Sequence, residues 1–118
     1  MSLPIITFVN HASVIFSNKK INLITDPWLF GSAFNNNWDL ISKSKMQTDD
    51  FENITHIWFS HEHPDHFAVQ VLYSIPEKIR KKIHVLFQDT LDHRVAKKCR
   101  ELGFHVTEMK HNKLYKLD

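Results

Sequence analysis

The order of apolar segments in the second half of the chain limits the fold more than any other feature. Residues 54–60, 83–87 and 104–108 are apolar runs of strand length, whereas residues 67–75 carry apolar side chains at helical spacing. A second helix is expected between the last two runs. This alternation of strand, helix, strand, helix and strand predicts parallel strands joined by right-handed crossovers.

The second helix has the clearest limits in the sequence. Asp89 and Thr90 are residues that commonly begin a helix, and Gly103 supplies a left-handed stop. Apolar side chains recur between them along one face, at Leu91, Val95, Cys99 and Leu102. We therefore expect the helix to begin at Asp89 and to end before Gly103.

The first half of the chain predicts an antiparallel hairpin followed by a long loop. Residues 5–16 and 21–25 are rich in β-branched and aromatic residues and flank a polar turn. Pro27 ends the second strand, since proline cannot donate to a sheet. Residues 28–50 lack periodicity and are expected to form a loop with one short helical turn. The predicted fold is α/β, with a mixed sheet in which the hairpin precedes a βαβαβ unit.

Composition excludes several function classes. The chain has 118 residues, 42% of them hydrophobic and 24% charged, which is typical of one globular domain covering residues 1–118. A formal net charge of +2 gives no electrostatic footprint for nucleic acid or an anionic membrane. A single cysteine, with no signal segment and no apolar run of membrane-spanning length, predicts a cytoplasmic protein.

Residues 61–66 carry the chemistry of the sequence. His61 and His63 lie two apart after a predicted strand, so extended backbone points both imidazoles to the same side. Pro64 is suited to begin a helix, which places Asp65 and His66 in its first turn. There the helix dipole favours an ionised carboxylate and an uncharged imidazole, the protonation states that a metal ligand needs.

Three imidazoles and one carboxylate are a donor set that suits Zn²⁺ or another borderline divalent ion, with Mn and Fe as alternatives. A zincin site is disfavoured, because it needs histidines four apart on one helix and Asp65 stands four after His61. The alternative is that the histidines are solvated loop residues. Their spacing between a strand and a helix favours the metal site.

The same residues match the HxHxDH signature of the metallo-β-lactamase superfamily, a set of binuclear metal hydrolases and related enzymes with an αβ/βα sandwich. Residues 10–13 and 24–29 resemble the opening of its ascorbate-6-phosphate lactonase branch, and residues 26–34 resemble the corresponding part of CMP-N-acetylneuraminate hydroxylase. The resemblance covers nearly the whole chain, which corresponds to the N-terminal half of the family's domain.

The resemblance implies a role for each matching residue. His61 and His63 would bind a first metal ion, and Asp65 and His66 a second. Asp65 would also be catalytic, because the family's two metal ions polarise a water molecule and Asp65 would shuttle a proton to the leaving group. Asp26 would be a structural residue near the site that contacts the metal ligands without binding a metal ion. His11 would have the same role, and the alternative is that it is an ordinary strand histidine.

The family's remaining ligands, a third histidine for the first metal, a bridging carboxylate and a last histidine, have no motif-supported match. The other histidines are expected to be structural or solvated: His84, His93, His105 and His111. We therefore expect a truncated domain whose second half is absent. Its uncovered sheet face would be apolar, which predicts a homo-oligomer assembled through that face.

The resemblance implies a metal-dependent hydrolase acting on an ester, lactone or phosphodiester. Four aromatic residues crowd the long loop, where they either line a pocket for a small sugar-like or nucleotide-like substrate or simply pack beneath the loop: Trp28, Phe30, Phe34 and Trp38. The alternative function is a non-catalytic module that binds metal or self-associates. Nucleic-acid processing has no supporting basic surface.

Overall fold

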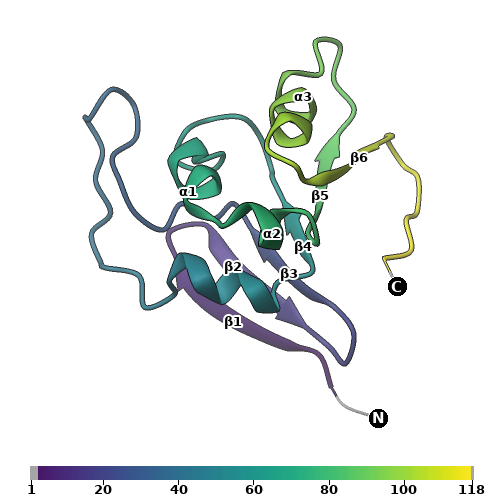
Figure 1. Ribbon diagram of the computed structural model, residues 1–118, viewed down its shortest axis with the longest axis horizontal. Helices are drawn as coiled ribbons and strands as arrows, with labels where there is room; N and C mark the ends of the chain where they lie inside the picture. The colour runs from purple at the N-terminus through teal and green to yellow at the C-terminus, as the bar shows by residue number, and fades with distance from the viewer. Residues whose placement is uncertain (1–2, 118) are drawn as a thin grey trace.

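A mixed sheet of six strands, arranged in chain order, forms the centre of the computed structural model, which describes residues 3–117 (Figure 1). The first three strands are antiparallel, and the last three run parallel to the third. The strands are β1 (Ile5–Asn10), β2 (Ser13–Ser17), β3 (Asn22–Thr25), β4 (His56–Trp58), β5 (His84–Gln88) and β6 (His105–Met109). The predicted α/β class and parallel second half are confirmed.

The antiparallel part has three strands, whereas the sequence predicted a hairpin of two. Residues 5–16 do not form one strand, because the chain reverses at His11, whose φ of 50° lies in the left-handed region. The hydroxyl of Ser13 donates to the carbonyls of Thr25 (2.8 Å) and Asp26 (2.7 Å), which ties the start of β2 to the end of β3. His11 is thereby held close to the carboxyl ends of the strands.

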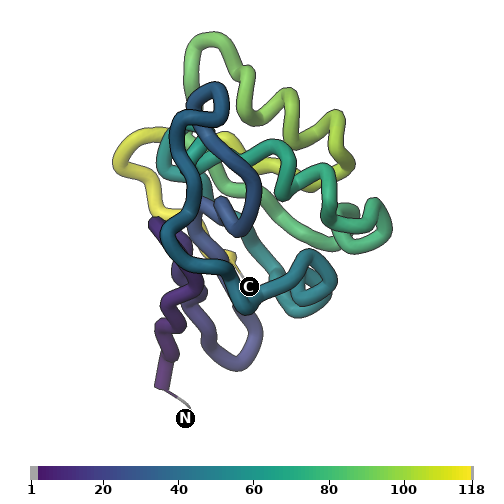
Figure 2. Tube along the Cα trace, turned by 90° about the vertical axis from the view of Figure 1, so that its left-hand side faces the viewer, coloured from purple at the N-terminus to yellow at the C-terminus, as the bar shows by residue number. Residues whose placement is uncertain are grey.

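The helices cover one face of the sheet, on the right in Figure 2. They are the 3-10 helix η1 (Thr48–Asn53) and the α-helices α1 (Val69–Ser74), α2 (Glu77–Arg80) and α3 (Arg94–Glu101). Ile24, Ile57 and Val85 stand in register on that face and are completely buried. The expected long loop is present, and its helical turn is η1 at its end.

Helix α3 begins five residues later than predicted. His93 adopts left-handed backbone with φ 56°, so the helix does not extend back to Asp89, and Leu91 is fully exposed. The predicted stop is confirmed, because Gly103 has φ +97°. Cys99 is buried beneath the helix, and burial raises the pKa of its thiol to about 12.

The opposite face of the sheet carries no helix. Ile6, Phe8 and Phe16 share this face through the β1–β2 register, and Phe8 is 69% exposed. The segment after β6 runs along the same side, on the left in Figure 2, and lies beside Trp58. An apolar area therefore remains open over β1 and β2. None of the helices formed by residues 3–117 has both the length and the apolar character needed to cross a bilayer.

Candidate metal centre

The histidine motif lies at the carboxyl end of β4, beside the end of β3. The two strands are parallel neighbours, with Thr25 opposite Trp58, and the amide of Asp26 donates to the carbonyl of Trp58 at 2.9 Å. Ligand sites of parallel sheets gather at this edge. Asp26, which follows β3, and Ser60, which follows β4, therefore meet directly in front of the motif.

Asp26 is buried and contacts Ser60, directly before the motif, and His66, the last residue of the motif. Its carboxylate accepts hydrogen bonds from the amide of Ser60 (2.8 Å) and from the hydroxyl of Ser60 (2.7 Å). It also lies 3.0 Å from Nδ1 of His66. The backbone of Asp26 has φ 37°, an uncommon conformation for a residue other than glycine and one that gathers at functional sites. One side chain thus fixes both ends of the motif.

The motif turn differs from the predicted helix start. The carbonyl of His63 accepts from the amides of His66 (2.9 Å) and Phe67 (2.8 Å), which closes an isolated turn. Ala68 is extended, and α1 begins only at Val69. Asp65 and His66 consequently lie in this turn and not in the first turn of a helix, so the helix-dipole argument does not apply to them. Their immediate neighbours set their protonation.

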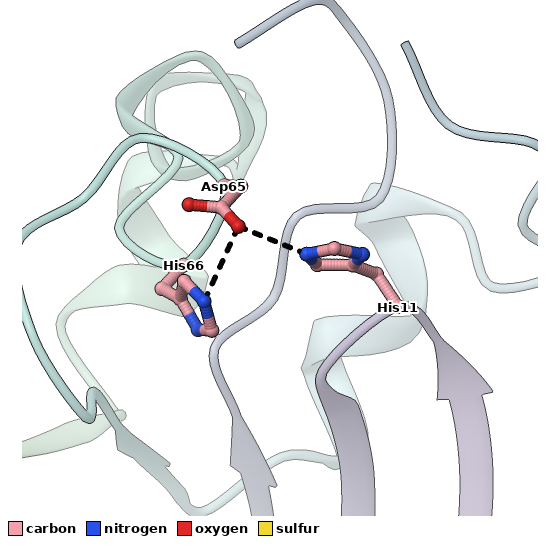
Figure 3. A group of neighbouring side chains, drawn as sticks. All are labelled: His11, Asp65 and His66. Carbon is pink, nitrogen blue, oxygen red and sulfur yellow. Dashed lines mark hydrogen bonds and ion pairs between the residues drawn. The ribbon is translucent and has the colours of Figure 1, made fainter. Parts of the chain in front are cut away.

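Asp65 is the buried centre of the group in Figure 3. One oxygen, Oδ2, lies 3.0 Å from Nε2 of His11 and 3.3 Å from Nε2 of His66. Burial raises the pKa of this carboxyl, but the hydrogen bond with His11, the charge of His66 and a backbone hydrogen bond together outweigh it. The net pKa lies below the usual 3.8, which favours the carboxylate.

The second oxygen of Asp65, Oδ1, is buried and has no hydrogen-bond partner among the described residues. Buried polar atoms are nearly always satisfied, and an exception commonly indicates an ion or water. An anionic oxygen beside two imidazoles is also a donor set that divalent metals bind. The residues present therefore fit a metal ion.

The structure brings some of the predicted ligands together more closely than others. Among the described residues, His11, Asp65 and His66 offer ligand atoms that all lie within 4.8 Å of one another. His61 and His63 are outside that group, although the ring of His61 lies 4.2 Å from that of His66 and 4.6 Å from that of His63, measured between centroids. All three motif histidines thus face a common region.

Sequence reasoning missed Ser60. Its hydroxyl lies 2.7 Å from Asp26 Oδ2 and 2.8 Å from His61 Nδ1, so it links the carboxylate to the motif. The only signal is its place directly before His61, and a serine there has no distinctive chemistry on its own. Its contacts depend on the pairing of β3 with β4.

The other histidines lie in ordinary structural settings. His84 and His105 are in strands, as expected, and His111 lies in the turn after β6. His93, which we expected inside a helix, precedes α3 and contacts Asp89 and Glu108 to form a second group of ligand types. That group is on the surface, and Glu108 is also paired with Arg100 at 3.2 Å.

Comparison with known proteins agrees with this geometry. The family model described as "Beta-lactamase superfamily domain" matches residues 5–117. The chain belongs to the metallo-β-lactamase superfamily. The match includes all six strands, from β1 to β6, and the histidine motif, so the predicted superfamily and its fold are confirmed.

Three relatives show how far the superfamily likeness extends. Cytidine monophosphate-N-acetylneuraminic acid hydroxylase of Xenopus laevis is 30% identical over 76 residues, which is 62% of this chain and 12% of that protein. The crystal structure of a possible metal-dependent hydrolase from Veillonella parvula has a TM-score of 0.65 and 22% identity, over 87% of this chain and 41% of that one. CmlA, a diiron β-hydroxylase from Streptomyces venezuelae, has a TM-score of 0.65 and 19% identity, over 98% and 22%.

This superfamily member spans less than half of each structural relative named above, and less than a fifth of the curated relatives that it matches. The relatives named above include a possible metal-dependent hydrolase and two hydroxylases. Likeness at these identities concerns the fold alone.

Proposed function

We propose that this chain provides the metal-binding half of a metal-dependent hydrolase acting on an ester, lactone or phosphodiester. The observation that carries the proposal is the unpartnered, buried Oδ1 of Asp65, which stands among imidazoles at the carboxyl ends of β3 and β4. A buried carboxylate oxygen is costly to leave without a partner, and a divalent cation would satisfy it.

The proposed ligands are those of the superfamily motif. His61 and His63 hold one ion, and Asp65 and His66 hold a second, with zinc as the first candidate and manganese or iron as alternatives. Asp26 orients His66 through the 3.0 Å contact at Nδ1, which directs Nε2 of that ring away from Asp26. His11 fixes Oδ2 of Asp65 in the same way, at 3.0 Å.

Bound divalent ions would polarise a water molecule and lower its pKa toward neutrality, which supplies a nucleophile. The chain's own contribution is to place donors and to handle a proton. Asp65 is the proposed proton carrier, and its lowered pKa keeps it in the carboxylate form at neutral pH. The hydrogen bond with His11 restricts Oδ2, which leaves the unpartnered Oδ1 as the oxygen that would face a metal ion.

A test of this proposal measures metal and turnover together on the 118-residue chain and on any longer version. We expect Zn²⁺ to bind wild type and to bind His61→Ala at least tenfold more weakly, while His105→Ala, a histidine outside the motif, binds like wild type. Hydrolysis is assayed on a panel of ester, lactone and phosphodiester substrates. If His61→Ala and His105→Ala bind Zn²⁺ equally well, the proposed metal site is wrong.

The alternative, a non-catalytic and self-associating module, is favoured by one specific observation. Ile6, Phe8 and Phe16 lie together on the helix-free face and are all exposed. They present on the order of 400 Å² of apolar surface, a patch size that marks interaction sites. We propose that a second copy covers this face, sheet against sheet. Two such patches bury less than the roughly 1,200 Å² of a standard interface, so the dimer is weak.

Sedimentation velocity at increasing protein concentration tests directly whether the chain forms this dimer. We expect wild type to dimerise, Phe8→Ser to remain monomeric, and Ile41→Ser to behave as wild type, because Ile41 is fully exposed on the long loop away from the sheet. A monomer at every concentration would reject the dimer. If the 118-residue chain dimerises and only a longer version hydrolyses a substrate, then catalysis belongs to the longer protein.

A further inference from the structure

The loop between β3 and η1 holds a short segment in an unusual backbone shape. Phe34, Asn35 and Asn36 have φ angles of 53°, 56° and 66°, three successive left-handed residues with no glycine. Asparagine tolerates this conformation, whereas phenylalanine rarely adopts it. The segment is closed by a pair of backbone hydrogen bonds between Ala33 and Trp38, at 2.9 and 3.1 Å. Such outliers gather at ligand-binding sites.

The closed segment presents two aromatic rings beside the histidine motif. Phe34 and Trp38 pack edge to face with centroids 4.8 Å apart, and Phe34 lies 6.0 Å from the ring of His63. Trp38 is 51% exposed. Trp28 of the same loop is 1% exposed and donates its indole N–H to the carbonyl of Gly31 at 2.8 Å, so that ring belongs to the core. Both tryptophans line the same cavity, and Trp38 is the accessible one of the two.

A cavity of about 530 Å³ adjoins Trp38, and its lining also includes Trp28 and His11. His11 lines it, and Nε2 of His11 lies 3.0 Å from Oδ2 of Asp65. Asn37 and Asp39 add polar groups at its wall. The volume is within the range of small-molecule sites, and an apolar wall with a few polar groups is their usual composition.

The charges around this cavity restrict the ligand. None of its described lining residues is lysine or arginine, and Asp39 contributes a carboxylate. Asp65 lies directly behind His11. An anionic group inside the cavity would meet the carboxylate of Asp39 and no lysine or arginine, whereas an uncharged ring can lie flat against the indole of Trp38.

We propose that this cavity binds an uncharged ring of the substrate against Trp38 and disfavours a substrate whose ring carries an anionic group. The reaction rests on the proposed function, whereas the binding of an uncharged ring does not require the metal. The two can therefore fail independently.

The experiment follows the three indole N–H signals of the 118-residue chain by NMR, with and without EDTA. The probes are benzamide, methyl β-glucopyranoside and phenyl phosphate, which represent an aromatic ring, a sugar ring and an anionic ring. We expect a neutral probe to shift the signal of Trp38 in a saturable way, with no shift of Trp58, which lies on the helix-free face. Phenyl phosphate, tested in EDTA, should bind at least tenfold more weakly.

Two loop variants provide matched controls. Trp38→Ala should weaken the neutral probe at least tenfold and Trp38→Phe should restore most of the affinity, whereas Phe30→Ala, an exposed aromatic residue of the same loop that does not line this cavity, should bind like wild type. Absence of any shift at Trp38, equal binding of phenyl phosphate in EDTA, or equal losses in Trp38→Ala and Phe30→Ala would overturn the inference. Loss of Zn²⁺ binding alone would overturn only the proposed function.

Discussion

Two groups of histidines occupy opposite ends of the parallel strands. The motif histidines follow the carboxyl end of β4 and surround the carboxylates of Asp26 and Asp65. His56, His84 and His105, here called the histidine row, are the first residues of β4, β5 and β6 and stand in register, with ring centroids 5.9 and 6.1 Å apart. The row faces the side without helices.

The difference between the groups lies in their partners. His84 Nε2 lies 2.6 Å from the hydroxyl of Thr107, and His56 Nδ1 lies 2.8 Å from that of Thr55; among the described residues, no ion pair joins the row to a carboxylate. Burial lowers the pKa of His56 and of His84, and the charge of the next histidine in the row lowers each further. His56 and His84 of the row thus have hydroxyl partners and lowered pKa values, whereas the motif histidine His66 lies beside two carboxylates.

The largest expected effect separates the groups by metal affinity. Asp65→Asn retains the shape of the side chain but removes the anionic charge at Oδ1, so Zn²⁺ affinity should fall by about 100-fold. His84→Gln, in the row, should leave the affinity within twofold of wild type. Isothermal titration with Zn²⁺ and a competing chelator measures both. Equal losses of Zn²⁺ affinity in the two variants would show that the motif and the histidine row do not differ in metal binding.

Stability should depend on the carboxylate that organises the motif. Asp26→Ala removes the acceptor of the amide and hydroxyl of Ser60, so it should cost about 2–3 kcal/mol of unfolding free energy. The matched control is Asp39→Ala, an exposed loop carboxylate that accepts from Ser32, expected to cost less than about 1 kcal/mol. Urea denaturation compares them, and similar costs would show that Asp26 has no special structural role.

A smaller effect concerns pH and belongs to the row alone. Because the folded-state pKa values of His56 and His84 lie below the unfolded value near 6.5, the unfolded chain takes up protons first as the pH falls. Their contribution is therefore complete above about pH 6.5 and is lost progressively below it. His84→Gln should give a shallower loss between pH 7 and pH 5 in urea unfolding, and an unchanged slope would contradict this assignment.

The smallest effect tests a motif residue with no proposed ligand role. Glu62 is half exposed and pairs with Arg94 at 2.7 Å. Glu62→Gln should change unfolding free energy by less than about 0.5 kcal/mol, as is usual for exposed pairs, and should leave Zn²⁺ affinity unchanged. A tenfold loss of Zn²⁺ affinity would make Glu62 part of the site.

The sequence predicted the motif and the parallel strands because both depend on local spacing. His61, His63, Asp65 and His66 are recognisable within six residues, and the apolar runs of β4, β5 and β6 differ in period from the helices between them. These features require no knowledge of which segments pair. Their placement at one sheet edge follows from the parallel topology.

What the sequence could not predict depends on backbone exceptions and on long-range register. The left-handed residues His11 and His93 divide the first predicted strand and delay α3, and neither position carries a glycine that would have marked it. The contacts of Ser60 and the alignment of the histidine row arise only when β3, β4, β5 and β6 pair in one register. A single sequence contains no signal for either.

The thiol of Cys99 gives the molecule a practical property. With a pKa of about 12, only about one thiol in 10⁵ is ionised at pH 7, so maleimides and disulfide reagents have almost no nucleophile to attack in the folded chain. A cysteine introduced at an exposed position such as Ile41 or Leu91 would then be the single labelling point. Fluorophores or spin labels can therefore be attached without first replacing the native residue.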